Sequence, residues 1–156
     1  METISAAPVT PRTRTSVVLP APTAAAGIAE AEVLVAAGRG VGGPENLELV
    51  FRLAALFPKS AVAGSRIACD LGWLEYPRQV GVTGATVAPR LYIACGISGA
   101  VQHVMGMRGA GFVVAVNKDP AAAIFREADV CIVDDLAEFL PVLIEKARSA
   151  RREDQS

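Results

Sequence analysis

Residues 91–103 read LYIACGISGAVQH, and this stretch decides the fold. The apolar run at residues 91–95 has the composition of a strand that is buried on both faces of a parallel sheet. Gly96 ends the run, and the small residues after it lead into a predicted helix near residues 99–107. A strand, a glycine-containing turn and a helix in this order form one unit of an α/β fold.

The same order recurs along the chain on both sides of this stretch. Ser65 is the predicted N-cap of a helix that ends near Gly72, and apolar residues at helical spacing over residues 136–144 predict a last helix. Four further apolar runs predict strands, at residues 32–37, 61–63, 112–116 and 130–133. We therefore expect an α/β domain built on a mostly parallel sheet.

The chain is divided into three parts by composition. Residues 1–30 contain four prolines and many small residues, which predicts a flexible N-terminal arm. Residues 31–148 form the predicted cofactor-binding domain, and residues 149–156 form a polar C-terminal tail that we expect to fray.

Charge and hydropathy exclude several classes of protein. Fifteen Lys and Arg balance sixteen Asp and Glu, so we expect no nonspecific binding of nucleic acid. Every long apolar stretch is interrupted, which predicts no membrane-spanning helix, and the start of the sequence lacks a secretory signal, which predicts a cytoplasmic protein. Cys69, Cys95 and Cys131 lie far apart among apolar neighbours, so we expect buried thiols and no metal site.

Polar residues follow the predicted strands. Ligands of an open parallel sheet bind outside the carboxyl ends of its strands. The residues at those ends can hydrogen-bond, and several precede helices whose free amides can take an anion: Arg39, Ser65 and Arg66, Ser98, Asn117 and Asp135. This set predicts a site for a phosphate-bearing cofactor. No acid–base pair stands out, so no catalytic residue is predicted.

From the residues alone, the glycine-rich segment at residues 38–43 and the single histidine can each be interpreted in two ways. The segment GRGVGG at residues 38–43 lacks the third glycine of the dinucleotide fingerprint, so it is either a phosphate-binding loop or a tight turn before a helix. His103 is the only histidine, and it is either a ligand contact or a structural hydrogen-bonding group.

Six segments together resemble the C-terminal, FAD-binding domain of the electron-transfer flavoprotein alpha subunit, over about residues 30–148. They occur in the family's order and spacing: GRGVGGPENLEL, AGSRIACDLGW, VGVTG, PRLYIACGISGAVQHVMGM, VNKDP and DDL. The resemblance implies a doubly wound, mostly parallel sheet with helices on both faces. It also implies FAD, held extended along the carboxyl edge of the strands.

The resemblance also implies the cofactor contacts. Arg66 is expected against the isoalloxazine, Thr83 near its N5 atom, and His103 on its O2 side, where reduced flavin gathers negative charge. A cation or strong donor there makes reduction of the flavin easier. The full set of implied contacts is Arg39, Ser65, Arg66, Val80, Gly81, Val82, Thr83, Ser98, Gly99, Ala100, Val101, Gln102, His103, Asn117, Asp135 and Leu136.

The implied function is electron transfer. The domain would accept electrons from a flavin dehydrogenase and pass them on with a beta-like subunit as partner, acting as a carrier rather than as a substrate-converting enzyme. Two other functions stay open: a stand-alone flavoenzyme subunit of a specialised pathway, and a non-redox module that binds an adenine nucleotide. The family's alpha subunits carry a further N-terminal domain, so a homodimer is an alternative to the beta-like partner.

This sequence departs from the family pattern at four positions. Val82 stands where Gln is usual and Ala85 where Lys is usual, which removes one polar contact and one charge from the flavin turn. Asp134 replaces a small residue, and Ala123 replaces a usual Pro. The Ala123 change is interpreted as structural, and the other three changes predict either weaker FAD binding than is usual for the family or a site that is partly repurposed.

Overall fold

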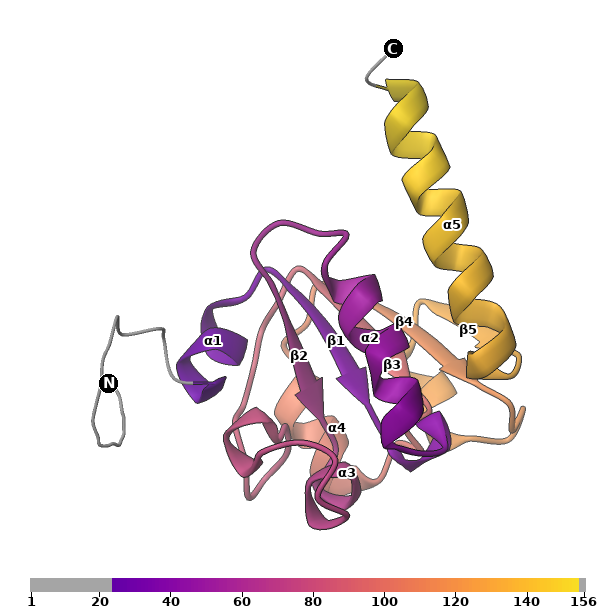
Figure 1. The fold of residues 1–156 in the computed structure, drawn as a ribbon. Helices are drawn as coiled ribbons and strands as arrows, with labels where there is room; N and C mark the ends of the chain where they lie inside the picture. Colours follow the sequence, from indigo (N-terminus) through magenta and orange to yellow (C-terminus); the bar gives the residue numbers. More distant parts are fainter. Residues whose placement is uncertain (1–23, 155–156) are drawn as a thin grey trace.

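A computed structural model describes residues 24–154, and its centre is a single five-stranded sheet (Figure 1). Every neighbouring pair of strands is parallel, and the strand order is β2-β1-β3-β4-β5. The strands are β1 (Val33–Ala37), β2 (Ser60–Gly64), β3 (Leu91–Cys95), β4 (Phe112–Asn117) and β5 (Val130–Val133). The predicted α/β class and all five predicted strands are confirmed.

Helices connect the strands. Ser65 caps α3 as predicted, because its hydroxyl accepts a hydrogen bond from the Ala68 amide at 3.2 Å. Gly72 follows the end of this helix with a left-handed φ of 80°. The α-helices are α1 (Ala24–Glu30), α2 (Leu47–Ala54), α3 (Arg66–Asp70), α4 (Val101–Met107) and α5 (Leu136–Asp154). Short 3-10 turns are η1 (Arg39–Val41), η2 (Pro44–Asn46), η3 (Tyr76–Arg78) and η4 (Ala123–Glu127).

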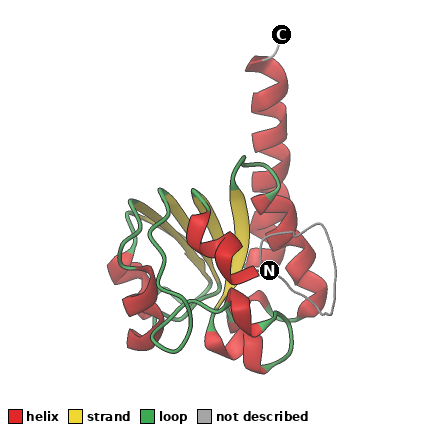
Figure 2. Cartoon of the chain, turned by 90° about the vertical axis from the view of Figure 1, so that its left-hand side faces the viewer, coloured by secondary structure: helices red, strands yellow, loops and turns green. Residues whose placement is uncertain are grey.

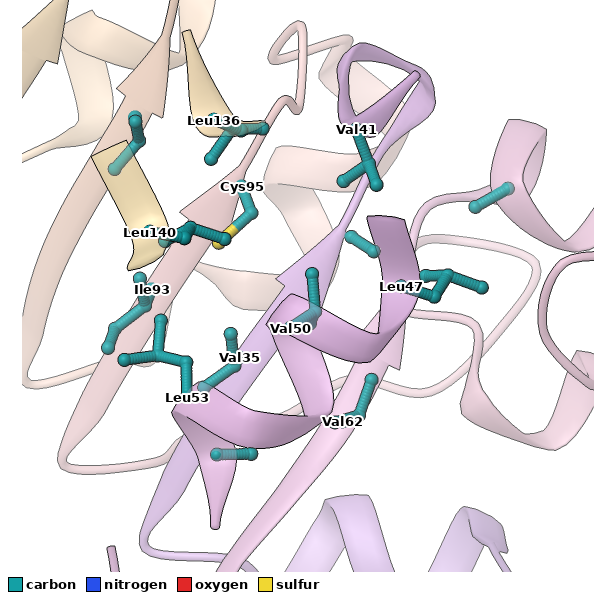
Figure 3. Close-up of a cluster of buried hydrophobic side chains, with 14 of the residues drawn as sticks. Val35, Val41, Leu47, Val50, Leu53, Val62, Ile93, Cys95, Leu136 and Leu140 are labelled. Carbon is teal, nitrogen blue, oxygen red and sulfur yellow. The ribbon is translucent and has the colours of Figure 1, made fainter. Parts of the chain in front are cut away.

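The sheet is covered on both faces, as a doubly wound fold requires (Figure 2). On one face, β-strand side chains such as Val35 and Ile93 pack against Leu53 of α2 and Leu140 of α5 (Figure 3). On the other face, Tyr92 belongs to a cluster that includes Ile28 of α1, Met107 of α4 and Ile124 of η4. Side chains alternate between the faces along each strand, so β1, β2, β3 and β4 contribute to both clusters, whereas the edge strand β5 contributes Ile132 to the first cluster.

The strand register brings the carboxyl ends to one edge. Ala37 of β1 pairs with Gly64 of β2 and with Cys95 of β3, and Asn117 of β4 pairs with Val133 of β5. The residues that follow these strands therefore start from the same edge of the sheet.

The helical ends differ from the sequence-based prediction. The sequence predicts a flexible arm over residues 1–30, but residues 24–30 form α1. Ile28 of this helix is 1% exposed because it packs into the core. Residues 1–23 of the predicted arm lie outside the described residues. Residues 149–154, predicted to fray, continue α5, which projects beyond the sheet (Figures 1 and 2). Ala, Arg and Glu at this end are strong helix formers with no Gly or Pro among them, and Arg152 pairs with Glu145 at 3.7 Å.

Two smaller predictions also need correction. Cys69 and Cys95 are buried as predicted, but Cys131 is exposed because β5 is the edge strand of the sheet. The helix predicted near residues 99–107 begins at Val101, since Gly99 has a left-handed φ of 94°. Within residues 24–154, no helix is both long and apolar enough to cross a membrane.

Two glycine-containing turns touch at the middle of the carboxyl edge. The Gly38 amide donates to the Cys95 carbonyl and the Gly40 amide to the Gly96 carbonyl, both at 2.9 Å. Gly96 has a left-handed φ of 67°, and a Cβ atom placed on it would lie 2.5 Å from the backbone carbon of Gly40. Side chains at these glycines are therefore excluded by the backbone itself, and we call this contact the glycine crossing (residues 38–40 against residues 95–97).

The glycine crossing should be essential for stability. We expect Gly96→Ala to lower the free energy of unfolding by roughly 2–5 kcal/mol, because left-handed strain costs about 1–2 kcal/mol and overpacking about 1–3 kcal/mol. The measurement is urea denaturation followed by circular dichroism. Gly72→Ala is the matched control, since Gly72 has a φ of 80° but nothing lies within 4 Å of its added Cβ. Equal losses in the two variants would show that the crossing adds nothing beyond backbone strain.

Candidate functional site

The strand order places a ligand crevice at the glycine crossing. In a sheet of order 2-1-3-4-5, chain direction across the sheet reverses between the first and third strands, and ligands bind outside the carboxyl ends at this switch point. Here β1 and β3 are neighbours, and the turns that follow them make the glycine crossing. One cavity lies on the β2 side of this switch point, and a second lies toward β4 and β5.

The first cavity, of about 270 Å³, collects most of the predicted contacts. Its walls come from the ends of β1, β2 and β3, from the start of α4 and from the turn at residues 79–83. The predicted residues that line it are Arg39, Ser65, Arg66, Val80, Gly81, Val82, Thr83, Ser98, Ala100, Gln102 and His103. The structure thus gathers at one place residues that span more than sixty positions of sequence, from Arg39 to His103.

The turn at residues 79–85 is held rigidly beside the sheet. The Val80 amide donates to the Gly64 carbonyl of β2, and the Val82 amide donates to the Gln102 carbonyl of α4, both at 2.9 Å. The Gln79 side chain, 6% exposed, donates from Nε2 to the Thr83 hydroxyl oxygen at 2.9 Å. Because this oxygen accepts from Gln79, the Thr83 hydroxyl proton remains available for an acceptor in the cavity.

His103, like Gln79, is a buried polar residue of the cavity. Its Nε2 lies 2.8 Å from the Tyr92 hydroxyl, and its ring meets the tyrosine ring edge to face at 6.1 Å. Within residues 24–154, its Nδ1 is buried without a hydrogen-bond partner. Burial lowers the pKa of His103 to about 4, and the nearby Val80 carbonyl opposes this only in part. At neutral pH the imidazole is therefore uncharged and can offer one N–H and one lone pair.

Two cations border the same cavity. Arg66 pairs loosely with Asp70 one turn along α3, at 3.5 Å, and its side chain stays 68% exposed. Arg39 lines the cavity from η1 and forms no ion pair with any residue in the described part of the chain. The amides of Ser98 and Ala100, which line this cavity, also have no hydrogen-bond partner among residues 24–154. The cavity is therefore rich in hydrogen-bond donors and positive charge, which suits an electron-rich or anionic ligand.

The second cavity, of about 180 Å³, is more acidic. Asp134, Asp135 and Lys118 line it, together with Asn117 and Leu136. The Asp135 carboxylate accepts from the Ala137 amide at 2.8 Å and so caps α5. Carboxylate oxygens at such a position can accept hydrogen bonds from sugar hydroxyls.

Two predicted contacts do not line either cavity. The missing Cβ of Gly99 would point at the backbone of Ile124, 2.2 Å from its nitrogen, so this glycine serves the packing of η4. The Val101 side chain is 66% exposed on α4. Their contact with a cofactor, like that of the lining residues, stays a prediction.

Sequence reasoning missed two side chains that organise the site. Gln79 fixes the Thr83 hydroxyl, and Tyr92 holds His103. Gln79 precedes the VGVTG turn with no pattern that marks it as buried. A signal did exist for Tyr92, since a hydroxyl in the middle of a buried strand needs a partner, and the following helix carries the only histidine.

Comparison with known proteins identifies the family. The family model described as "Electron transfer flavoprotein FAD-binding domain" matches residues 27–108, just over half of the chain. The chain is 48% identical over 122 residues to an electron transfer flavoprotein subunit alpha of Thermoanaerobacterium thermosaccharolyticum, covering 78% of this chain and 37% of that protein. It is 52% identical over 121 residues to the protein FixB of Clostridium saccharobutylicum, covering 78% of this chain and 36% of that protein.

Among solved structures, a proposed sugar-phosphate isomerase of Listeria monocytogenes aligns with a TM-score of 0.42 and 17% identity, over 84% of this chain and 77% of that one. A likeness of this degree says nothing about function.

The family match includes the segments that follow β1, β2 and β3 at the carboxyl edge of the sheet, and the chain spans little more than a third of the length of these curated relatives. Because the family model covers more than half of the chain, membership does not depend on the fold alone. The chain belongs to the electron transfer flavoprotein family as an alpha-like FAD-binding domain, and its cofactor is FAD.

Proposed function

We propose that this domain is an electron carrier, whose FAD accepts electrons from a flavin dehydrogenase and passes them on. In this proposal the isoalloxazine end of FAD occupies the first cavity and the adenosine end occupies the second. Bound FAD supplies the redox chemistry, because its ring takes up and releases electrons. The protein supplies binding, orientation and electrostatics.

The observation that carries the proposal is the donor-rich lining of the first cavity. The buried Nδ1 of His103 lacks a partner within the described residues, and the Thr83 hydroxyl proton is free. Flavin carries carbonyl oxygens and ring nitrogens that accept hydrogen bonds, so both groups fit the ring. Drug-sized ligand sites measure roughly 300–1,000 Å³. Neither cavity alone reaches this size, but the two together do, as an extended dinucleotide requires.

The same lining favours electron uptake. Donors and cations beside the flavin stabilise its electron-rich reduced forms more than its neutral oxidised form, so they raise its reduction potential. Arg66 and Arg39 act through charge, whereas His103 and Thr83 act through hydrogen bonds. We infer that these four side chains set the potential, while Asn117 and Asp135 serve the remainder of the cofactor.

A partner chain is expected over the mouth of the first cavity. Val82 is 55% exposed at this mouth, and Val101 and Met105 are 66% and 54% exposed one turn apart on α4. The Val82 amide bonds to the Gln102 carbonyl, so these apolar side chains belong to neighbouring segments. We propose that a beta-like subunit or a dehydrogenase covers them, with a homodimer as the alternative.

Flavin binding is the first test. The full chain, stripped of flavin and titrated with FAD with and without a beta-like subunit, should take up FAD and show the flavin absorption bands. A flavin dehydrogenase should then reduce it. Tight binding of AMP or ADP by a chain that never takes up FAD would favour the nucleotide-binding module. Bleaching by a small substrate without a protein partner would favour a stand-alone flavoenzyme.

Arg66 should raise the flavin potential. Its side chain is largely exposed, so solvent reduces its stabilisation of the reduced flavin to roughly 0.5–1 kcal/mol. For one electron, a tenfold change in the equilibrium constant corresponds to about 59 mV. Arg66→Gln should therefore lower the reduction potential of the flavin by about 20–40 mV per electron. The measurement is a reductive titration of the FAD-loaded protein against a reference dye. Arg90→Gln is the control, because the Arg90 side chain is even more exposed, at 85%, but precedes β3 at the opposite edge of the sheet. The same decrease in both variants would contradict a local effect.

The Thr83 hydroxyl should contribute to FAD affinity. Thr83→Val keeps the shape and removes the donor, and a lost hydrogen bond of about 0.5–1.5 kcal/mol should raise the FAD dissociation constant roughly 2- to 12-fold. Thr86→Val changes an exposed threonine of the same segment that does not line the cavity. Fluorescence titration compares the two variants, and unchanged affinity in Thr83→Val would remove this residue from the site.

A further inference from the structure

The hydrogen bond between Tyr92 and His103 joins the core of the sheet to the first cavity. Tyr92 stands on β3 and is fully buried, and its hydroxyl lies 2.8 Å from Nε2 of His103 on α4. His103 is 6% exposed and lines the cavity. Its other ring nitrogen, Nδ1, is buried and has no hydrogen-bond partner of good geometry within residues 24–154, although the Val80 carbonyl lies beside the ring. An orphaned polar atom of this kind, beside a cavity, points to a ligand.

The position of the histidine proton follows from the surroundings of the tyrosine. In the described part of the chain, Nε2 of His103 is the one hydrogen-bond partner of the Tyr92 hydroxyl. Burial, and to a smaller degree Cys95, raises the pKa of Tyr92, so the phenol keeps its proton. A buried O–H that does not donate loses a hydrogen bond, so the hydroxyl donates to Nε2. A neutral imidazole that accepts at Nε2 carries its proton on Nδ1.

We propose that Tyr92 is a positioning residue that fixes His103 as the Nδ1–H tautomer and thereby presents a neutral N–H donor to an acceptor atom of the ligand. The proposal rests on the proposed function in one respect, since the acceptor is taken to be a carbonyl oxygen or ring nitrogen of the flavin. The tautomer itself belongs to the protein and exists before the cofactor binds.

The packing of β3, α4 and the turn at residues 79–85 also prevents the His103 imidazole ring from rotating by 180°. Tyr92 pairs with residues of β1 and β4 on its two sides, because β3 lies between these strands in the sheet. Gly106 lets α4 pack directly against the turn at residues 79–85, since a Cβ on Gly106 would lie 2.4 Å from the Gly81 nitrogen. The imidazole is thus confined between strand and turn, where the Tyr92 hydroxyl at Nε2 and the Val80 carbonyl beside the ring both favour the proton on Nδ1.

The single histidine makes the test direct. The full chain labelled with 15N-histidine gives two ring-nitrogen signals, one for each nitrogen of His103. We expect a pyridine-type Nε2 and a pyrrole-type Nδ1 without FAD, and a shift of the Nδ1–H proton when FAD is added. A pyrrole-type Nε2 in the native chain would overturn the proposal, whether or not any variant folds.

Tyr92→Phe removes the hydroxyl and keeps the ring. We expect a mixture of tautomers, a lower flavin potential, and an FAD dissociation constant raised roughly 2- to 12-fold by the loss of one well-oriented hydrogen bond. Tyr76→Phe is the matched control for the tautomer, because its exposed hydroxyl bonds Asp70 outside the cavity, and it should leave His103 as a single Nδ1–H tautomer. A single Nδ1–H tautomer retained in Tyr92→Phe would show that the tyrosine does not fix the proton.

The two proposals fail in different ways. If FAD does not bind but the Nδ1–H tautomer is present in the native chain and lost in Tyr92→Phe, the proposed function fails and the positioning role stands. If FAD binds and the Nδ1–H signal does not move, presentation of this donor to the ligand is wrong while flavin binding stands.

Discussion

The close contact between the Gly38–Gly40 turn and the Gly96 turn is the constraint on which the rest of the structure depends. Two turns that leave neighbouring parallel strands must separate or touch, and here they touch through backbone hydrogen bonds of 2.9 Å. Side chains are excluded at this contact, because added Cβ atoms would overlap the opposite backbone. The contact fixes where the polypeptide turns away from the sheet on each side, and it therefore fixes both cavities.

The site differs in character on the two sides of this contact. Toward β2, a neutral histidine, a threonine hydroxyl and two arginines make a cavity of donors. Toward β5, Asp134 and Asp135 provide acceptors, one of which also caps α5. A ligand with an electron-rich ring at one end and sugar hydroxyls at the other matches this polarity. The same division explains why added negative charge at Asp134 is compatible with the fold: it lies on the acceptor side.

Much of the fold could be predicted from the sequence, because buried parallel strands are continuous apolar runs such as Leu91–Cys95. The helical ends could not, since local composition does not reveal tertiary contact. The small residues before Glu30 have the composition of a linker, yet the Ile28 side chain packs into the core. Cys131 looks buried, yet it lies on an edge strand, and strand order is a property of the whole sheet.

The candidate site was predictable to a similar extent. Residues that follow strands, such as Arg39 and Ser98, could be found because the carboxyl ends share one edge. Gln79 and Tyr92 could not, since each acts through a second side chain that only the folded chain brings within hydrogen-bond distance. Gly99 belongs to the same motif, but its missing side chain accommodates η4, and its contact with a ligand stays a prediction.

The chemistry of the first cavity depends on combining two kinds of electrostatic support. An exposed guanidinium such as Arg66 acts over a distance, but water and salt screen it. A neutral N–H donor on a buried ring acts only at contact, but it operates where the local dielectric is low and loses little to screening. A protonated His103 would offer more charge, yet burial opposes protonation, as its lowered pKa shows. The fold therefore places a dipole, the N–H group of neutral His103, at the buried end of the site. The charged groups, Arg39 and Arg66, lie at its mouth, where a partner chain would alter their solvation.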